Sequence, residues 1–396
     1  MSANAAPPRG PVGIRDVAAL AEVSTGTVSN TINHPERVHP RTRSAVEHAI
    51  RKLGFVPNQQ ARVLTGASSN VIGLVVLDVE SPFYMEAAHA IERATRESGH
   101  VVMLCNSGGE LEREAGLLTM LAAQRVRGVL LAPASSDNAD RYTHLPGELP
   151  VVLIDYDAGP EHCSVSVDNI AGGRLAVQHL LDLGHTRIGF VGGPTGLRQF
   201  AQRAYGARLA IAEAGLDPDD ALLEVAVSGI GIQDGRRAVE LLLESGPPEA
   251  IFCGNDMLAF GVYRGLIDAG YRVPDDIALV GYDDIDFAKD WVVPLTSVRQ
   301  PIDQLGSGAA NLLLEHSSRD GSHQHRQVLL EPEPVIRRST GRRNPAALWG
   351  LVGVGAGWSG CLALGAALTQ ENCDPARSRL TEIRGSRGIR PPFFLS

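Results

Sequence analysis

Eight short apolar segments, separated by stretches with helical spacing, restrict the fold of this chain more than any other feature. They lie at 71–77, 101–105, 128–132, 151–154, 187–191, 222–227, 250–253 and 277–282. Most are continuous apolar runs rather than alternations of apolar and polar residues, which is typical of strands covered by helices on both faces. The pattern therefore predicts an α/β fold with parallel sheets.

Roughly ten strands are expected in all, which exceed one comfortable open sheet, and the run of segments divides naturally into two series. The stretch between Val165 and Gly172 has the character of a first crossover between the series, and 294–301 that of a return crossover. We therefore expect two similar lobes with a cleft between them. Ligands of such proteins bind outside the carboxyl ends of the strands.

Residues 12–57 have a different pattern, that of a compact helical unit. Apolar residues recur at helical spacing over Ile14–Ala21, and Ser24 is placed to cap a second helix over Thr25–Asn33. Pro40 suits the first turn of a third helix that Gly54 ends. Three short helices with a tight turn between the first two predict a helix-turn-helix unit.

The charge of the chain is unevenly distributed. The formal net charge is −9, yet residues 1–68 carry +4 and the remainder −13. A small basic head on an acidic body indicates a polyanion-binding module attached to something else. The alternative for residues 14–33 is a structural three-helix bundle that binds no DNA.

At 14–66 the chain closely resembles the DNA-binding head of the LacI/GalR family of bacterial transcriptional repressors. The resemblance joins the helix-turn-helix DVAALAEVSTGTVS to LGFVPN and ARVL at the family's spacing. It extends to about Thr340 through motifs similar to that family's effector domain: SPFY, GGRLAVQHLLDLGHTRIGFVGGP, CGNDMLAFG, VPDDIALVGYDD and PLTSVRQP. It implies a helix-turn-helix head followed by a two-lobed effector domain like the periplasmic binding proteins.

The resemblance also implies which head residues contact DNA. Thr25, Gly26 and Asn30 would face base edges in the major groove, where Asn can bond adenine with two hydrogen bonds. The phosphate contacts would come from Ser24, Thr27, Ser29 and Asn33. The family commonly has a longer polar residue at position 26 and Arg at position 30. Glu22 occupies a turn position where Gly is frequent, which would cost about 1 kcal/mol in a left-handed conformation.

A hinge follows the head at 58–68. Its first seven residues, 58–64, are too few for a stable isolated helix, but the resemblance implies that this segment becomes helical when paired with its dimer mate in the minor groove. Leu64 would wedge open the central base step, and Ala61 would allow close packing of the two helices. Asn58 and Arg62 complete the contacts expected there. The alternative is that Leu64 packs on the body.

The effector-binding residues implied by the resemblance follow strands or begin helices: Phe83, Tyr84, Asp155, Arg203, Asn255 and Asp283. Carboxylate and amide acceptors, a guanidinium and an aromatic platform suit the hydroxyls of a sugar. A nucleobase would require a second aromatic wall. Asp155 and Asp78 are weaker candidates, Asp256 is better explained as a helix cap, and Phe83 could instead belong to the core.

Several classes of protein are disfavoured. The acidic pairs Asp283-Asp284 and Asp155/Asp157 do not converge, and no nucleophile-elbow or phosphate-loop motif occurs, so we expect no catalytic residues and no cofactor. Five scattered cysteines form no metal-binding pattern, so we expect reduced thiols and no bound metal. The N-terminus has no secretory signal, so we expect a cytoplasmic location.

The last segment lies beyond the resemblance. Residues 346–368 are uncharged and long enough to span a bilayer, but a disordered extension is the preferred interpretation over a membrane anchor. The predicted organisation is a disordered N-terminus at 1–11, the head at 12–57, the hinge at 58–68, an effector-binding and dimerisation domain at 69–340, and an extension of uncertain structure at 341–396.

The leading hypothesis is a cytoplasmic homodimeric repressor that binds a palindromic double-stranded DNA operator under the control of a small-molecule effector, a sugar or sugar derivative. The alternatives are a sugar-binding protein without a DNA role and a membrane-tethered form of the regulator.

Overall fold

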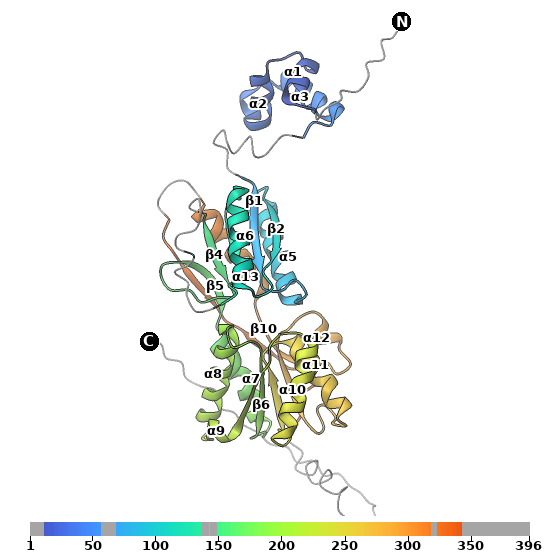
Figure 1. Cartoon of the computed structure of the whole chain (residues 1–396), viewed down its shortest axis with the longest axis vertical. Coiled ribbons are helices and arrows are strands. Elements are labelled where there is room, and N and C mark those ends of the chain that lie inside the picture. Colours follow the sequence, from blue (N-terminus) through green and yellow to red (C-terminus); the bar gives the residue numbers. More distant parts are fainter. Residues whose placement is uncertain (1–11, 57–68, 136–141, 143–148, 318–322, 343–396) are drawn as a thin grey trace, which may run out of the picture. The chain divides into compact units, whose positions relative to one another are not determined.

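The chain contains a small helical head and a larger body with two sheets (Figure 1). The computed structural model describes residues 12–56, 69–135, 142, 149–317 and 323–342. The predictions for the hinge residues Asn58, Ala61, Arg62 and Leu64, for the N-terminus and for the extension from 343 onward fall outside these residues. The head and the body are described separately.

The head folds into three α-helices and one turn of 3-10 helix. These are α1 (Ile14–Leu20), α2 (Thr25–Asn33), η1 (Pro35–Arg37) and α3 (Pro40–Leu53). Ser24 caps α2 as predicted, because its Oγ accepts a hydrogen bond of 3.1 Å from the backbone N–H of Thr27. Gly54 ends α3 in the left-handed conformation, with φ of 63°. The three helices enclose a small core of Val17, Ala18, Val28, Val46 and Ala49.

The turn between α1 and α2 contains a strained residue. Glu22 has φ of 54°, in the left-handed region that residues other than glycine adopt rarely and at a steric cost. We expect Glu22→Gly to stabilise the head by about 1 kcal/mol, because glycine adopts this conformation without a steric cost. Exchange of the buried Val28 amide in the full chain should slow about fivefold. Glu22→Ala keeps the strain and should leave that exchange rate unchanged; equal slowing in both variants would contradict the explanation.

The first lobe is a sheet with helices on its faces. Its strands have the order β11-β5-β4-β3-β1-β2, all parallel to their neighbours. Its elements are β1 (Val71–Val76), α5 (Pro82–Arg96), β2 (Val101–Asn106), α6 (Leu111–Ala123), β3 (Val129–Leu131), β4 (Val151–Ile154), β5 (Cys163–Val167), α13 (Ile302–His316) and β11 (Gln327–Leu330). Helix α13 packs against α5 and against strands β3 to β5.

The second lobe repeats this plan. Its strand order is β12-β10-β9-β8-β6-β7, with β12 antiparallel to β10. Its elements are α7 (Asn169–Asp182), β6 (Ile188–Gly192), α8 (Arg198–Glu213), α9 (Pro218–Ala221), β7 (Leu222–Ala226), α10 (Ile232–Glu244), β8 (Ala250–Cys253), α11 (Asp256–Asp268), β9 (Ala278–Asp283), α12 (Phe287–Asp290), β10 (Thr296–Arg299) and β12 (Glu333–Val335). The helices pair closely as α7 with α8 and α10 with α11.

Three described segments connect the two lobes. The first joins β5 to α7 and the second joins β10 to α13, both within the predicted crossovers. The third, between Leu330 of β11 and Glu333 of β12, was not predicted. The carboxyl ends of β1 and β4 in the first lobe and of β8 and β9 in the second therefore face the space between the lobes. The residues that follow these strands lie there.

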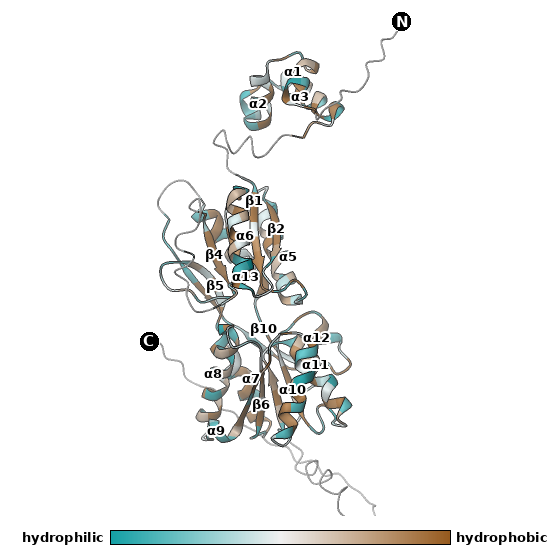
Figure 2. Ribbon diagram, in the orientation of Figure 1, coloured by the Kyte–Doolittle hydropathy of each residue, from teal (hydrophilic) through white to brown (hydrophobic). Residues whose placement is uncertain are grey.

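All eight predicted strands are present, and the α/β class with parallel sheets is confirmed. Figure 2 shows that the central strands are predominantly hydrophobic, in keeping with the continuous apolar runs. Strand β2 is an exception to the expectation of full burial. It lies at the edge of its sheet, and Val101, Met103 and Leu104 leave 58, 38 and 41% of their surface exposed.

Candidate DNA-binding surface and effector site

Helix α2 presents the residues predicted to read bases. Thr25, Gly26 and Asn30 are all exposed, and the cap at Ser24 places Thr25 and Gly26 in the first turn. A helix whose first residues are exposed and uncharged can approach base edges in the major groove. The structure therefore leaves this face of α2 accessible.

The residues predicted to contact phosphates are partly engaged with one another. The hydroxyls of Ser24 and Thr27 lie 2.9 Å apart, and Asn33 Nδ2 donates to Ser29 Oγ over 3.2 Å. These contacts hold the side chains in place along α2. Each hydroxyl can still make a further bond to a phosphate oxygen.

We expect Asn30→Ala to weaken operator binding about tenfold while leaving binding to random DNA unchanged, because a bidentate contact to adenine is worth about 1–3 kcal/mol and acts only at its own base. Ser29→Ala is the matched control, since loss of a phosphate contact should weaken both complexes equally. Gel shifts on both duplexes at one salt concentration give the comparison. A similar loss on random DNA for Asn30→Ala would contradict base reading.

All six residues predicted to bind effector line one buried cavity between the lobes. Phe83 and Tyr84 lie in the first turn of α5, and Asp155 directly follows β4. The second lobe contributes the other three: Arg203 lies in α8, Asn255 caps α11, and Asp283 ends β9. Each is at most 8% exposed, so their polar groups face the cavity or the protein interior rather than solvent.

Arg203 is held rigidly at the side of the second lobe. Its Nε donates to Asn169 Oδ1 over 2.8 Å, its Nη1 donates to the Gly254 carbonyl, and its guanidinium lies 3.6 Å above the centre of the Tyr282 ring. Gly173 allows this arrangement, because a Cβ there would lie 2.0 Å from the Arg203 carbonyl oxygen. The close pairing of α7 and α8 therefore fixes the position of the guanidinium.

Two buried carboxyl groups flank Arg203. Tyr84 donates its hydroxyl to Asp155 Oδ2 over 3.2 Å, and Gln300 Nε2 donates to Asp283 Oδ1 over 2.7 Å. Two buried acceptors, Asp155 Oδ1 and Gln300 Oε1, have no hydrogen-bond partner among the described residues. Because buried polar atoms are nearly always bonded, acceptors of this kind suit a ligand that brings hydroxyl donors.

The backbone at these carboxylates is strained. Asp155 has φ of 53°, Asp283 of 108° and the neighbouring Asp284 of 56°. Residues in this region cost of order 1–3 kcal/mol each and cluster at ligand-binding sites, where the surrounding structure holds them. Asp284 is held by ion pairs with Arg299 at 2.7 Å and Arg337 at 2.6 Å. The strain turns the Asp283 side chain into the cavity and that of Asp284 toward these arginines.

Burial raises the pKa of Asp155 to about 6 and that of Asp283 to about 7, although the Arg203 charge acts in the opposite direction on both. Because these pKa values are raised above the usual value of about 4, the two groups stabilise the ligand-free fold most fully below about pH 4, and this contribution is lost as the pH rises from there through 6 to 7. Hydroxyl donors from a ligand would stabilise the charged carboxylates.

Effector binding is therefore expected to tighten by about tenfold between pH 5 and pH 7.5 and to release protons at the lower pH. Isothermal titration in two buffers of different ionisation enthalpy measures both quantities. Asp283→Asn should remove the part of this dependence that lies near pH 7. An affinity independent of pH would show that the carboxylates do not change protonation on binding.

The structure adds cavity residues that the sequence did not single out. Gln300 lies on the return crossover, Gln199 Nε2 lies 3.4 Å from Asp155 Oδ2, and Phe200 contributes a further aromatic ring. Phe200 precedes Arg203 by three residues on one helix face, a spacing that could have identified it. Phe83 both lines the cavity and belongs to the core, so the two interpretations of it are compatible.

Two other aspartates lie elsewhere. Asp256 is fully buried and, contrary to the prediction, does not cap α11; Asn255 does so through the Leu258 amide at 2.8 Å. Asp256 instead accepts bonds from the Ile285 amide at 2.9 Å and Ser297 Oγ at 2.6 Å. Asp78 accepts a local bond from the Glu80 amide and does not line the cavity.

The cavity is closed in this arrangement of the lobes. It encloses about 20 Å³, whereas sites for small molecules usually have about 300–1,000 Å³. Hydrogen bonds join the lobes around it, from the Asp286 amide to Glu86 Oε1 at 3.3 Å and from Arg198 Nη1 to the Asp157 carbonyl at 3.2 Å. Entry of a sugar therefore requires these contacts to open.

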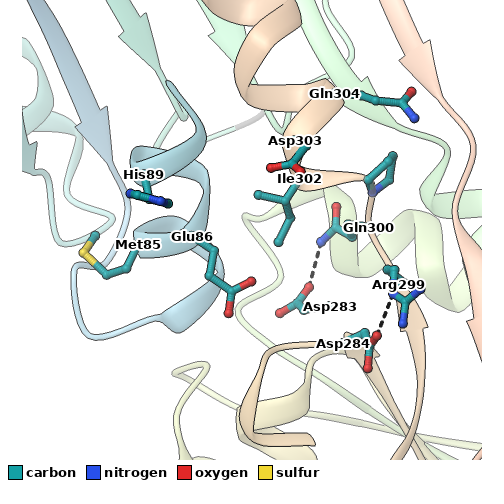
Figure 3. Close-up of a pocket in the computed structure, with 11 residues that line it drawn as sticks. Met85, Glu86, His89, Asp283, Asp284, Arg299, Gln300, Ile302, Asp303 and Gln304 are labelled. Carbon is teal, nitrogen blue, oxygen red and sulfur yellow. Dashed lines mark hydrogen bonds and ion pairs between the residues drawn. The ribbon is translucent and has the colours of Figure 1, made fainter. Parts of the chain in front are cut away.

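A larger cavity of about 630 Å³ lies next to the closed one. Figure 3 shows Met85, Glu86 and His89 of α5 on one side of it, with Ile302 and Gln304 of α13 across from them. Asp283 and Gln300, which hydrogen bond to each other, line both cavities. Movement of this pair would connect the two spaces.

Among the described residues, no helix is both long and apolar enough to cross a membrane. The segment 346–368 lies outside them.

Comparisons with known proteins agree with both parts of the chain. Residues 13–58 match the model for bacterial regulatory proteins of the lacI family, and residues 177–340 match a periplasmic binding protein-like domain. The HTH-type transcriptional repressor PurR of Aliivibrio salmonicida is 35% identical over 331 residues, covering 82% of this chain and 98% of the relative. The ribose operon repressor of Escherichia coli is 36% identical over 327 residues, covering 82% of this chain and 97% of the relative.

Solved structures give the same result. The lac repressor dimer bound to operator has a TM-score of 0.73 at 27% identity and covers 84% of this chain and 100% of its own. A complex of the regulator CelR with cellobiose has a TM-score of 0.61 at 33% identity, and the match covers 83% of this chain and 99% of the CelR chain. The helix-turn-helix head and the two-lobed body define a ligand-responsive DNA-binding regulator. This chain belongs to the lacI family of bacterial regulatory proteins.

Membership of this family confirms the predicted class of function. The chain is a DNA-binding transcriptional regulator rather than an enzyme, as its relatives are transcriptional repressors. The match over the head also disfavours a sugar-binding protein without a DNA role.

Proposed function

We propose that this chain is a homodimeric repressor that binds a palindromic operator and releases or retains it according to the presence of a sugar. The observation that carries the proposal is the cavity in which Phe83, Tyr84 and Asp155 of one lobe meet Arg203, Asn255 and Asp283 of the other. A ligand that touches both lobes changes the balance between their arrangements. That balance is the means by which binding in the body can affect the heads.

A sugar suits the cavity better than a nucleobase does. Asp155 and Asp283 offer carboxylate acceptors, Gln300 offers an amide, and Arg203 offers donors, so hydroxyls that both donate and accept can be matched. A regulator from Enterococcus faecium with bound ribose has a TM-score of 0.62 at 29% identity. A nucleobase is the second candidate, because Phe200 supplies an aromatic wall beyond Phe83 and Tyr84.

The head supports the DNA-binding half of the proposal. We assign base reading to Thr25, Gly26 and Asn30, and phosphate contacts to Ser24, Thr27, Ser29 and Asn33. The sequence-based roles of Asn58, Ala61, Arg62 and Leu64 at the minor groove complete the assignment. A head of this size buries little DNA surface, so two heads on a two-fold axis would read a palindrome.

The edge of the first lobe supports the dimer. Strand β2 pairs only with β1 within the described sheet and leaves Val101, Met103 and Leu104 partly exposed. A flat apolar edge of this kind is normally covered by a partner. We place the second copy there and assign 69–340 to effector binding and dimerisation. Because operator DNA lies in the bacterial cytoplasm, we place the protein there as well.

Two experiments test the proposal on the full chain. Selection from random duplexes at low salt should enrich a palindrome, and its absence would contradict the repressor assignment. A thermal-shift screen of sugars, sugar acids and nucleobases should identify the effector class, because a ligand at 100 times its dissociation constant adds about 2.7 kcal/mol of stability. Stabilisation by nucleobases alone would replace the sugar with the second candidate.

A further inference from the structure

A cluster of histidines and one cysteine lies in the first lobe, apart from the effector cavity. Cys163 is the first residue of β5, and His323 and His325 lie just before β11, the neighbouring strand. One ligand atom from each of these three side chains lies within 4.8 Å of the other two. Sequence spacing does not predict this group, because about 160 residues separate the cysteine from the histidines.

The cluster lies at the opposite end of the sheet from the effector residues. Strands β4 and β5 run parallel, with Val152 opposite Cys163 and Ile154 opposite Val165. Cys163 is therefore at the amino end of β5, whereas Asp155 follows the carboxyl end of β4. The two groups do not share a cavity, so the cluster is not part of the effector site.

The geometry suits a tetrahedral metal ion. Metal–sulfur and metal–nitrogen bonds of about 2.3 and 2.0 Å place tetrahedral ligand atoms about 3.3–3.8 Å apart. Cys163 Sγ and His323 Nε2 already lie 3.2 Å apart, and His325 is close to both. Small side-chain movements would therefore bring the three ligand atoms around one ion.

The surroundings hold the ligands in place while leaving one side accessible. Cys163 is fully buried, His323 is half-buried and His325 is exposed. The ring of His316, at the end of α13, stacks on that of His323 with centroids 4.1 Å apart and planes 11° from parallel. The Nδ1 atom of His316 is buried and has no hydrogen-bond partner among the described residues. Because His325 is exposed, an ion could enter from solvent past its side chain.

We propose that Cys163, His323 and His325 form a binding site for a transition-metal ion of the Zn²⁺ class. One thiolate and two imidazoles are ligands that select zinc and its neighbours over magnesium or calcium. Binding transfers the Cys163 thiol proton to solvent and leaves the fourth position to water. The ion links the segment entering β11 to β5, and β11 leads directly into the third connection between the lobes.

Cobalt provides the direct test, since Co²⁺ reports its ligands by absorption. Untagged full-length protein, freed of metal by a chelator, is titrated with Co²⁺ and then with Zn²⁺. We expect one equivalent of Co²⁺ to give a thiolate charge-transfer band in the near ultraviolet and the visible bands of tetrahedral cobalt, and Zn²⁺ to abolish both. Absence of these bands at one equivalent would overturn the proposal and leave the 3.2 Å contact as a simple hydrogen bond.

Variants separate this site from incidental binding. Cys163→Ser should remove the charge-transfer band, and Cys105→Ser, at the half-buried cysteine of β2, should keep it. His325→Ala should weaken Zn²⁺ binding at least tenfold; since His325 is exposed, this variant is expected to fold even if Cys163→Ser does not. His100→Ala, at a histidine before β2, is its control. Equal Zn²⁺ affinity in the His325 and His100 variants would contradict the site.

Discussion

Asp283→Ala is expected to abolish the response to effector while leaving operator binding in the absence of effector nearly unchanged. Asp283 is buried in the cavity and bonded to Gln300 at 2.7 Å, where it can accept a hydroxyl from the ligand. Loss of a hydrogen bond to a charged group costs about 1.5–3 kcal/mol, which lowers effector affinity by about 10- to 150-fold. Isothermal titration gives the affinity, and gel shifts with and without effector give the response.

The matched control is Asp219→Ala, at an aspartate of the same lobe whose side chain is 83% exposed. It should leave effector affinity unchanged. Wild-type effector affinity in the Asp283 variant would remove Asp283 from the site. Arg203→Ala is a less clean test, because it would also leave Asn169 Oδ1 and the Gly254 carbonyl without their donor. We therefore expect that variant to lose stability as well as effector binding.

Val101→Glu is expected to weaken dimerisation by about 100-fold or more and operator binding with it. Val101 is 58% exposed in the single chain, so the substitution leaves the fold of one protomer intact. In a two-fold interface along β2 it would bury a carboxylate from each copy close to its mate, and such juxtaposed like charges cost several kcal/mol. Sedimentation velocity measures the dimer, and a gel shift measures the operator complex.

Leu329→Glu makes the corresponding change on β11, at the other edge of the same sheet, where Leu329 is 60% exposed. This variant should remain dimeric and bind operator normally. A dimeric Val101 variant would contradict the placement of the second copy on β2. A monomeric Leu329 variant would move the interface to the opposite edge.

Much of the fold follows from local sequence patterns. The eight apolar runs form strands, and Ser24, Pro40 and Gly54 lie where the helices of the head begin and end. Strand β5 was missed because its sequence CSVSV alternates serine with apolar residues. Its serines are nevertheless buried, and Ser164 Oγ accepts a bond from the Ala158 amide. The short strands β11 and β12 are partly exposed and have no such run.

The candidate site was predictable where it depends on strand ends. Residues that follow β4 and β9 must lie at the same edge of their sheets, and Asp155 and Asp283 do so. Gln300 depends on how the return crossover passes between the lobes, and sequence spacing carries no information on that path. The approach of His323 and His325 to Cys163 likewise depends on the pairing of β11 with β5.

Control of operator binding by a ligand between the lobes can be measured by a gel shift of the wild-type chain on the selected palindrome, with and without the sugar that stabilises the body. We predict that saturating sugar changes operator affinity by about 5- to 150-fold and leaves affinity for random DNA unchanged. A sugar that binds the body tightly and leaves operator affinity unaltered would show that the ligand does not control DNA binding.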